Sequence, residues 1–289
     1  MKLLAISDLH LGHAGNRAAL ETMGSYPDDW LVLAGDTGER ATHLELALGA
    51  LVPRFRQVIW TPGNHDLWTP PGGSGVAHYE ALVALCREHK VLTPEDPYAA
   101  WPPEPDTFVV PMFLLFDYSF RPPEVPADRA VAWARETGVG CSDEHLLDPA
   151  PFESRAVWCH ARCRATEARL ADLPTGARTI LVNHWPLRYD LARPPRIPRF
   201  SIWCGTSVTE DWGRRHRARA VVSGHLHMRT TLWRDGVRYE EVSLGYPRDW
   251  RQERGVDWYL RQILPVLKPE DERFIPSRDP FIALKEINT

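Results

Sequence analysis

Five short apolar runs in this chain are each followed at once by polar side chains of the kind that bind metals. The runs are LLAIS, WLVLAG, QVIWTPG, TILVN and ARAVVSG. Apolar runs of this length, with polar residues only at their carboxyl ends, are typical of buried strands in an α/β sheet. Ligands at the carboxyl ends of such strands converge in one crevice. We therefore expect the five polar segments to form one site.

These segments contain the ligands for a metal site. They are Asp8-Leu9-His10, Gly35-Asp36, Gly63-Asn64-His65-Asp66, Asn183-His184 and Gly224-His225-Leu226-His227. The candidate ligands among them are two aspartates, one asparagine and four histidines, namely Asp8, Asp36, Asn64, His10, His184, His225 and His227, and His65 is left over. Seven ligands with one shared carboxylate are the right number to hold two divalent ions side by side. The glycines at positions 35, 63 and 224 permit tight turns next to the metals.

Further elements follow from apolar spacing and from proline. Helical spacing predicts helices at residues 41–51, 75–89 and 151–173. Residues 106–116 are apolar and rich in strand-forming side chains, but Pro111 predicts an edge strand or a strand with a break.

A hairpin and two loop regions complete the pattern. Residues 230–242 predict the hairpin, because Asp235-Gly236 suits a type I′ turn. Proline-rich loops are expected at about residues 94–130 and 186–206, near the site. The second loop has four prolines and four arginines between positions 185 and 200, and loops beside active sites often carry specificity.

Length and composition indicate a single α/β enzyme domain with a short extension. The chain has 289 residues, of which 44% are hydrophobic and 25% charged. We expect a catalytic domain at residues 1–246, and an extension at 247–289 that packs on the body or contacts a partner. We expect neither a signal peptide nor a membrane span. Five cysteines without a pairing pattern favour a cytoplasmic location.

The motifs D-x-H, G-D, G-N-H-D, N-H and G-H-x-H, in this order and spacing, resemble the calcineurin-like metallophosphoesterase superfamily. They extend from Asp8 to His227, most of the chain. The resemblance implies an α/β fold in which a β-sandwich of two mixed sheets is flanked by helices, with the metal site at the carboxyl ends of the strands. One departure concerns the residues after the G-D motif. Several branches carry Asp or Tyr there, whereas this chain continues Asp36-Thr37-Gly38-Glu39, which leaves the subfamily and the substrate open.

The same resemblance implies two adjoining ion sites. One ion would be held by Asp8, His10, Asp36 and His227. The other would be held by Asp36, Asn64, His184 and His225, so that Asp36 bridges the two. Carboxylate oxygens together with imidazoles suit Mn, Fe, Zn or Co as divalent or mixed-valence ions.

The implied reaction is the hydrolysis of a phosphoester by a metal-bound hydroxide. His65 would protonate the leaving group, as an imidazole can near neutral pH. Asp66 would orient His65 or raise its pKa, unless it is a turn or cap residue. Four residues next to the ligand segments could contact substrate or serve the structure: His13, Trp68, Arg188 and Tyr189.

An arginine-rich run bears on the substrate. Eight arginines lie between Arg188 and Arg219, against three acidic residues. Because the run flanks His184 and His225, we expect it near the mouth of the site. It is either a solvated face or a docking surface for an anionic partner.

Several other segments narrow the resemblance. PFESRAVWCHARCRATEARLA, FSIWCGT, VVSGHLHMRTT and YEEVSLGYPRDW are similar to an actinobacterial group in which phosphopantetheinyl hydrolases occur. Such enzymes cut the phosphodiester between 4′-phosphopantetheine and a serine of an acyl or peptidyl carrier protein. Carrier proteins are typically acidic, which would give the arginine run a role.

Three alternatives remain open. The first is a small-molecule phosphomonoesterase or cyclic-nucleotide phosphodiesterase, which needs no protein-docking surface. The second is a nuclease, although a pI of about 6.3 argues against an extended nucleic-acid surface. The third is a non-catalytic scaffold, against which the intact ligand set and His65 argue. We expect no membrane partner, and the oligomeric state stays open.

Overall fold

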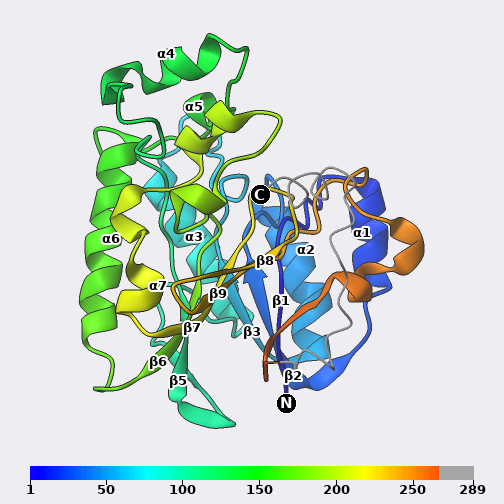
Figure 1. Ribbon diagram of the computed structural model, residues 1–289. Coiled ribbons are helices and arrows are strands. Elements are labelled where there is room, and N and C mark those ends of the chain that lie inside the picture. The colour runs from blue at the N-terminus through cyan, green and yellow to red at the C-terminus, as the bar shows by residue number, and fades with distance from the viewer. Residues whose placement is uncertain (267–289) are drawn as a thin grey trace, which may run out of the picture.

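Two β-sheets form the centre of the computed structural model, which describes residues 1–266 (Figure 1). The first sheet has the strand order β10-β1-β2-β3 and the second the order β4-β5-β6-β7-β9-β8. The strands of the first sheet are β1 (Leu3–Ile6), β2 (Tyr26–Ala34), β3 (Phe55–Thr61) and β10 (Arg261–Leu264). Those of the second are β4 (Ala99–Trp101), β5 (Glu104–Pro111), β6 (Arg178–Val182), β7 (Ala218–Ser223), β8 (Thr231–Arg234) and β9 (Val237–Glu241). Both sheets mix parallel and antiparallel pairs, as expected.

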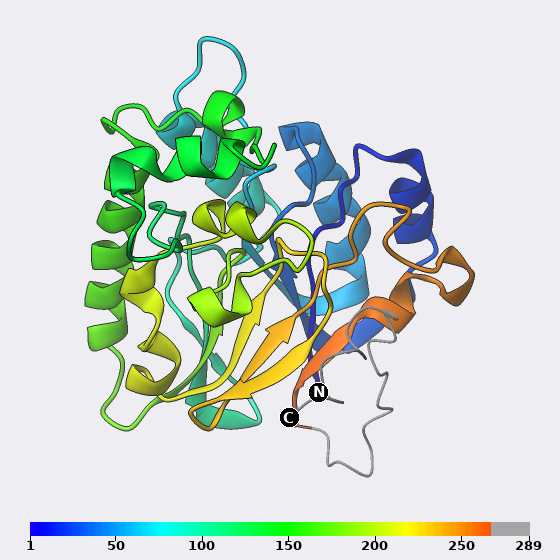
Figure 2. The same ribbon diagram turned by 45° about the horizontal axis from the view of Figure 1, so that its top comes forward.

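Helices cover the outer faces of the sheets. They are α1 (Ala14–Glu21), α2 (Ala41–Leu51), α3 (Gly75–Glu88), α4 (Ala130–Arg135), α5 (Asp143–Leu146), α6 (Arg155–Ala171) and α7 (Trp212–Arg215). In Figure 1, α1 and α2 lie on one side of the paired sheets and α6 on the other, while α4 stands apart above them. Figure 2 shows the molecule turned so that the end that carries α4 comes forward.

The five strands that precede the polar segments are all present. Each is covered on both faces by other parts of the protein. Leu3 and Val32 of the first sheet pack against Ile180 and Val222 of the second. The alternate side chains of the same strands, such as Leu31, pack into the larger core that includes the helices. Strands covered in this way have continuous apolar sequences, as parallel strands usually do.

The predicted helices and the hairpin are present, but the loop expected at about residues 94–130 was wrong in part, because it contains β4 and the start of β5, which pair with each other. Helix α2 has the predicted bounds, and α6 begins only at Arg155 because the Ser154 hydroxyl accepts a hydrogen bond from the Val157 N–H. Asp235 and Gly236 join β8 to β9 with φ angles of 52° and 77°. Of the two alternatives for residues 106–116, an edge strand or a strand with a break, the structure shows the second, because β5 ends at Pro111. This strand pairs with both β4 and β6, and Pro111 is tolerated because it is the last residue of the strand.

The described part of the predicted extension, residues 247–266, packs on the body. Strand β10 pairs antiparallel with β1, and the Trp250 indole donates to Asn16 Oδ1 at 3.0 Å. The rest of that extension, residues 267–289, lies outside the described residues. Among residues 1–266, no helix combines the length and the apolar character needed to cross a membrane.

Candidate metal centre

All seven predicted ligands lie in one cluster at the carboxyl ends of β1, β2, β3, β6 and β7. In one half of the cluster, His227 Nε2 is 3.0 Å from Asp8 Oδ1 and 3.2 Å from His10 Nε2. His10 Nε2 is also 3.9 Å from Asp36 Oδ2. Four donor atoms from three strand ends therefore surround one point.

The other half of the cluster is built around an amide oxygen. Asn64 Oδ1 lies 3.1 Å from His184 Nε2 and 3.1 Å from His225 Nδ1. Asp36 Oδ2 lies 3.4 Å from His184 Nε2. The same carboxylate oxygen thus faces both halves, which is the arrangement expected of a bridging aspartate.

The backbone around these residues is unusual. Five of the seven have left-handed φ angles, between 42° and 75°, which non-glycine residues seldom adopt. These residues are Asp8, His10, Asp36, His225 and His227. A Cβ on Gly63 would lie 2.1 Å from Asp36 Oδ1, and one on Gly224 would lie 2.3 Å from Asp8 Oδ2. The chain is therefore folded tightly around the side chains of the cluster, and such strain concentrates at functional sites.

A second layer of hydrogen bonds fixes the orientation of the candidate ligands. The far nitrogen of His227, Nδ1, donates to Asp249 Oδ2 at 2.9 Å, and His184 Nδ1 donates to the Ala34 carbonyl at 2.9 Å. The Ser7 and Ser243 hydroxyls donate to Asp8 Oδ2 at 2.5 and 2.8 Å. Metal-binding histidines commonly have such partners, because the outer hydrogen bond sets the tautomer and leaves the inner nitrogen free.

The donor set fits a pair of divalent cations. Two buried carboxylates, an amide oxygen and four imidazole nitrogens converge, and the two carboxylates favour positive charge beside them. Burial alone would lower the pKa of His227, yet Asp8 and Asp249 raise it to about 10. Burial would likewise lower the pKa of His184, yet Asp36 and Asp8 raise it to about 9. Metal ions can replace the protons that such a cluster attracts.

His65 lies at the rim of this cluster, between two acidic side chains. Its Nε2 is 4.0 Å from Asp36 Oδ2, and its Nδ1 is 3.6 Å from Glu39 Oε1. Burial alone would lower its pKa, but Asp36 and Glu39 raise it. In return, His65 lowers the pKa of Glu39 to about 2. The Trp68 ring lies against the imidazole with centroids 3.9 Å apart. The surroundings therefore favour a protonated His65.

Asp66 does not orient His65. Within residues 1–266 its buried carboxylate accepts hydrogen bonds from the Thr37 N–H and hydroxyl, at 3.1 and 2.6 Å, and from the Gly63 N–H at 2.9 Å. These bonds tie together the loops that carry Asp36 and Asn64. The carboxylate that faces the His65 ring is that of Glu39, and of the two roles left open for Asp66 these contacts support the turn or cap residue.

Replacing Asp66 with alanine is expected to lower thermal stability. Three buried donors would lose their acceptor, at about 1–3 kcal/mol for each donor left unpaired. The control is Asp106→Ala, which removes a carboxylate that is 60% exposed and pairs with Arg178. Thermal unfolding of both variants checks this. An unchanged midpoint for Asp66→Ala, with activity lost, would return Asp66 to a catalytic role.

The four tentative substrate residues divide into two pairs. Trp68 contacts His65, and the ring of His13 meets that of Tyr246, which itself stacks on His10 with centroids 4.4 Å apart. Arg188 instead pairs with Asp190 and Asp235, at 2.8 and 2.9 Å. Tyr189 packs against Phe120 and Arg193. Trp68 and His13 therefore lie at the cluster. Arg188 contacts the hairpin beside it, and Tyr189 packs within the neighbouring loops.

Several residues at the site were missed by sequence reasoning. The sequence held a signal for Glu39, because this residue follows shortly after the G-D motif, where several branches carry Asp or Tyr. Tyr246 and Asp249 lie in the segment YEEVSLGYPRDW, whose resemblance was noted without a role for either residue, and Asp143 had no signal. Phe200, from the proline-rich loop, stacks on His225 with centroids 5.7 Å apart, which places that loop over the cluster.

The expectation that the whole arginine run lies near the mouth was wrong. The Arg217 carbonyl accepts from the Thr179 N–H at 3.3 Å, at the amino end of β6. Strand β7 then runs back toward His225, so at about 3.3 Å per residue the two ends are roughly 20 Å apart. Four of the eight arginines are at or beside this far end: Arg214, Arg215, Arg217 and Arg219. The reason is that the chain crosses the full length of the sheet between the loop and β7.

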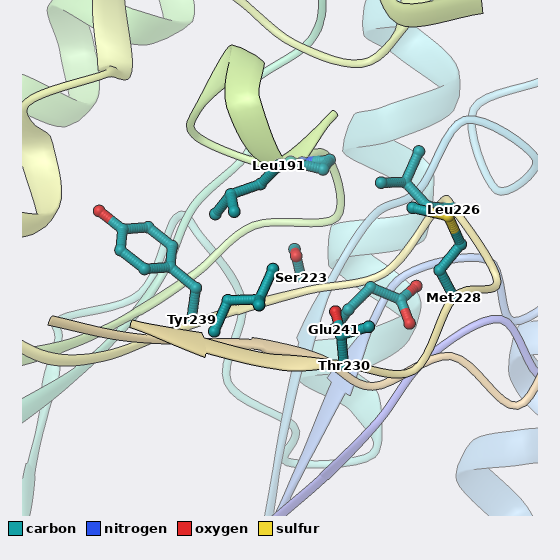
Figure 3. Close-up of a pocket in the computed structure, with 9 residues that line it drawn as sticks. Leu191, Ser223, Leu226, Met228, Thr230, Tyr239 and Glu241 are labelled. Carbon is teal, nitrogen blue, oxygen red and sulfur yellow. The ribbon is translucent and has the colours of Figure 1, made fainter. Parts of the chain in front are cut away.

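A small pocket adjoins the segment that carries His225 and His227 (Figure 3). Among its lining residues are Leu191, Ser223, Leu226, Met228, Tyr239 and Glu241. Burial and the charge of Asp8 raise the pKa of Glu241. Because Leu226 stands between the two histidines, the pocket and the cluster share one loop. The cluster is thus bordered by a mainly apolar hollow with one buried carboxyl group.

The fold and this cluster define a metal-dependent phosphoester hydrolase. Residues 1–229 match the family model described as calcineurin-like phosphoesterase, and the chain belongs to that family, whose members carry a dinuclear divalent metal centre. The chain is 49% identical over 271 residues to the [acyl-carrier-protein] phosphodiesterase PptH of Mycobacterium tuberculosis, covering 91% of this chain and 83% of that protein. It is also similar to the crystal structure of phosphopantetheinyl hydrolase (PptH) from Mycobacterium tuberculosis. The TM-score is 0.86 at 46% identity, covering 93% of this chain and 97% of that one.

Proposed function

We propose that this enzyme hydrolyses the phosphodiester that joins 4′-phosphopantetheine to a serine of an acyl or peptidyl carrier protein. One observation carries the proposal, namely 49% identity over 91% of this chain to a protein named as an acyl-carrier-protein phosphodiesterase. The proposed location is the cytoplasm, since all five cysteines are unpaired.

The cluster supplies the ligands of the proposed metal centre. Asp8, His10, Asp36 and His227 would hold one ion, and Asp36, Asn64, His184 and His225 the other. Their mixture of oxygen and nitrogen donors supports Mn or Fe, with Zn or Co as further options. When bound, the two ions lower the pKa of a water molecule and neutralise charge on the phosphoryl oxygens.

The proton for the leaving group comes from His65 in this proposal. Water adds to phosphorus, the bond from phosphorus to the serine oxygen breaks, and His65 protonates that oxygen. The products are 4′-phosphopantetheine and a carrier protein with a free serine hydroxyl. Glu39 holds the far side of the imidazole, with His65 Nδ1 3.6 Å from its Oε1. A general acid in this position accelerates departure of an alkoxide, which is a poor leaving group.

A panel of four substrates in the presence of Mn²⁺ tests the proposal. The substrates are holo-carrier protein, bis-p-nitrophenyl phosphate, p-nitrophenyl phosphate and single-stranded DNA. We expect holo-carrier protein to lose its phosphopantetheine, as read by mass spectrometry of the intact protein. Hydrolysis of a chromogenic ester without cleavage of the carrier would favour the small-molecule phosphoesterase. DNA cleavage as the main activity would favour the nuclease.

Reversal of Arg193 and Arg196 to glutamate is expected to raise KM for the carrier about tenfold or more. Both side chains are exposed on the loop that reaches over His225, where they can steer an acidic protein. The remaining activity should depend less on salt, while hydrolysis of bis-p-nitrophenyl phosphate should change little.

The matched control reverses Arg214 and Arg217, which changes the charge equally at the far end of the sheet. At a distance of roughly two Debye lengths, these charges are largely screened at physiological salt. If both double variants raise KM equally, net charge rather than a docking surface explains the effect. If neither double variant raises KM, the arginine run is a solvent-exposed face that takes no part in docking.

A further inference from the structure

A buried carboxylate from outside the two sheets reaches the metal cluster. Asp143 begins α5, in the segment of residues 117–150, which we call the cap. Its side chain is fully buried. Its Oδ1 accepts hydrogen bonds from Asn64 Nδ2 at 3.1 Å and from Trp68 Nε1 at 2.8 Å. One oxygen atom of the cap therefore contacts both a proposed metal ligand and the aromatic ring beside His65.

The first contact determines which end of the Asn64 amide faces the cluster. An asparagine side chain has an oxygen that can bind a cation and an NH₂ group that cannot. The Asn64 oxygen lies 3.1 Å from His184 Nε2 and from His225 Nδ1. Because Asp143 Oδ1 accepts a hydrogen bond from the NH₂ group, it holds that group on its own side. A flipped amide would lose this bond and present N–H groups to the metal.

The second contact holds an aromatic ring in place. The indole N–H of Trp68 can only donate, and Asp143 Oδ1 is its acceptor. The ring of the same tryptophan lies 3.9 Å from that of His65, centroid to centroid. Fixing the indole by its N–H thus limits the positions open to the His65 imidazole.

We propose that Asp143 is a positioning residue through which the cap orients both the Asn64 amide toward the metal site and the Trp68 ring against His65. The inference rests on the proposed function for the roles of Asn64 and His65. It gives the cap a part in assembling the site, in addition to any part in covering it.

The adjacent residue, Glu144, provides a matched control. Its Oε1 accepts hydrogen bonds from the Tyr118 hydroxyl at 2.9 Å and from Trp203 Nε1 at 2.7 Å, and Arg155 also pairs with its carboxylate. The contacts with Trp203 and Arg155 hold the cap to the body, and none of the three contacts involves Asn64 or Trp68. Glu144→Ala therefore loosens the cap and leaves the two Asp143 contacts intact.

The experiment measures Mn²⁺ binding to metal-stripped variants by calorimetry. We expect Asp143→Ala to lower the affinity for one of the two ions about 10- to 100-fold, the usual effect of losing an outer-shell partner. Asp143→Asn keeps an acceptor oxygen and should bind within a few-fold of the wild type. Trp68→Phe removes the indole N–H together with part of the ring that lies against His65, so we expect wild-type metal affinity with a several-fold loss of kcat. Asp143→Leu, which leaves a smaller cavity, replaces Asp143→Ala if that variant does not fold.

Two results would overturn the inference. One is wild-type Mn²⁺ affinity in both Asp143→Ala and Asp143→Leu. The other is an equal loss of affinity in Glu144→Ala, which would show that any loosening of the cap has the same effect. The variant Asn64→Ala distinguishes failure of this inference from failure of the proposed function. If Asn64→Ala loses an ion while the Asp143 variants do not, only the positioning role fails. If Asn64→Ala also binds two ions normally, the assignment of Asn64 as a ligand fails.

Discussion

Replacing Asp36 with asparagine is expected to remove nearly all phosphoesterase activity and at least one metal ion. Asp36 Oδ2 lies 3.9 Å from His10 Nε2 and 3.4 Å from His184 Nε2, so it faces both halves of the cluster. Its other oxygen, Oδ1, accepts a hydrogen bond from the backbone N–H of His65 at 2.8 Å. Asparagine keeps the size of the side chain but lacks the negative charge that two cations would share. We expect turnover to fall by about 10³-fold or more, because even one lost stabilising donor can have that effect.

Metal content and turnover of the purified variant check this prediction. The wild type should contain two ions per chain, and chelation should abolish its activity until a divalent metal is restored. Asp106→Asn is the control, because it neutralises a carboxylate that lies outside the predicted ligand set, is 60% exposed and pairs with Arg178. It should retain both ions. An Asp36→Asn enzyme that keeps two ions and normal turnover would exclude the bridging role.

Replacing His65 with asparagine is expected to keep both ions and to lower kcat by roughly 10²–10⁴-fold on the carrier-protein substrate, the usual loss for a general acid. His65 is at the rim of the cluster, with 14% of its side chain exposed, and it is not among the predicted ligands. The loss should be much smaller for bis-p-nitrophenyl phosphate. Its leaving group is a stable phenolate that needs little protonation, whereas a serine alkoxide needs a proton as it departs.

Glu39→Gln extends the same test to the partner of His65. This change keeps the shape of the side chain and removes the charge that faces Nδ1. We expect a smaller loss of kcat than in His65→Asn, with the same dependence on the leaving group and with both metals retained. Equal losses for good and poor leaving groups in the His65 variant would mean that His65 positions the substrate and does not donate the proton.

The sequence by itself determined the five strands that precede the polar segments, the candidate ligands and the family. Each predicted ligand follows directly on a buried strand, so its place at one edge of the sheets follows from local order along the chain. Strands covered on both faces also produce long apolar runs that are easy to recognise. These are local properties, and for that reason five short motifs were sufficient to predict the cluster before any distance was known.

The surroundings of the cluster were decided only by the tertiary structure. Asp66 is next to His65 in the chain, yet its carboxylate turns to Thr37 and Gly63, and Glu39 from another loop faces the imidazole instead. Asp143 reaches Asn64 across 79 positions of sequence. The arginine run looked continuous, yet its second half lies at the far end of the sheet, because β6 and β7 are parallel and the chain must return to the opposite end of the sheet between them. Contacts between side chains depend on how loops cross over the sheets, and neither motif spacing nor apolar pattern records that crossing.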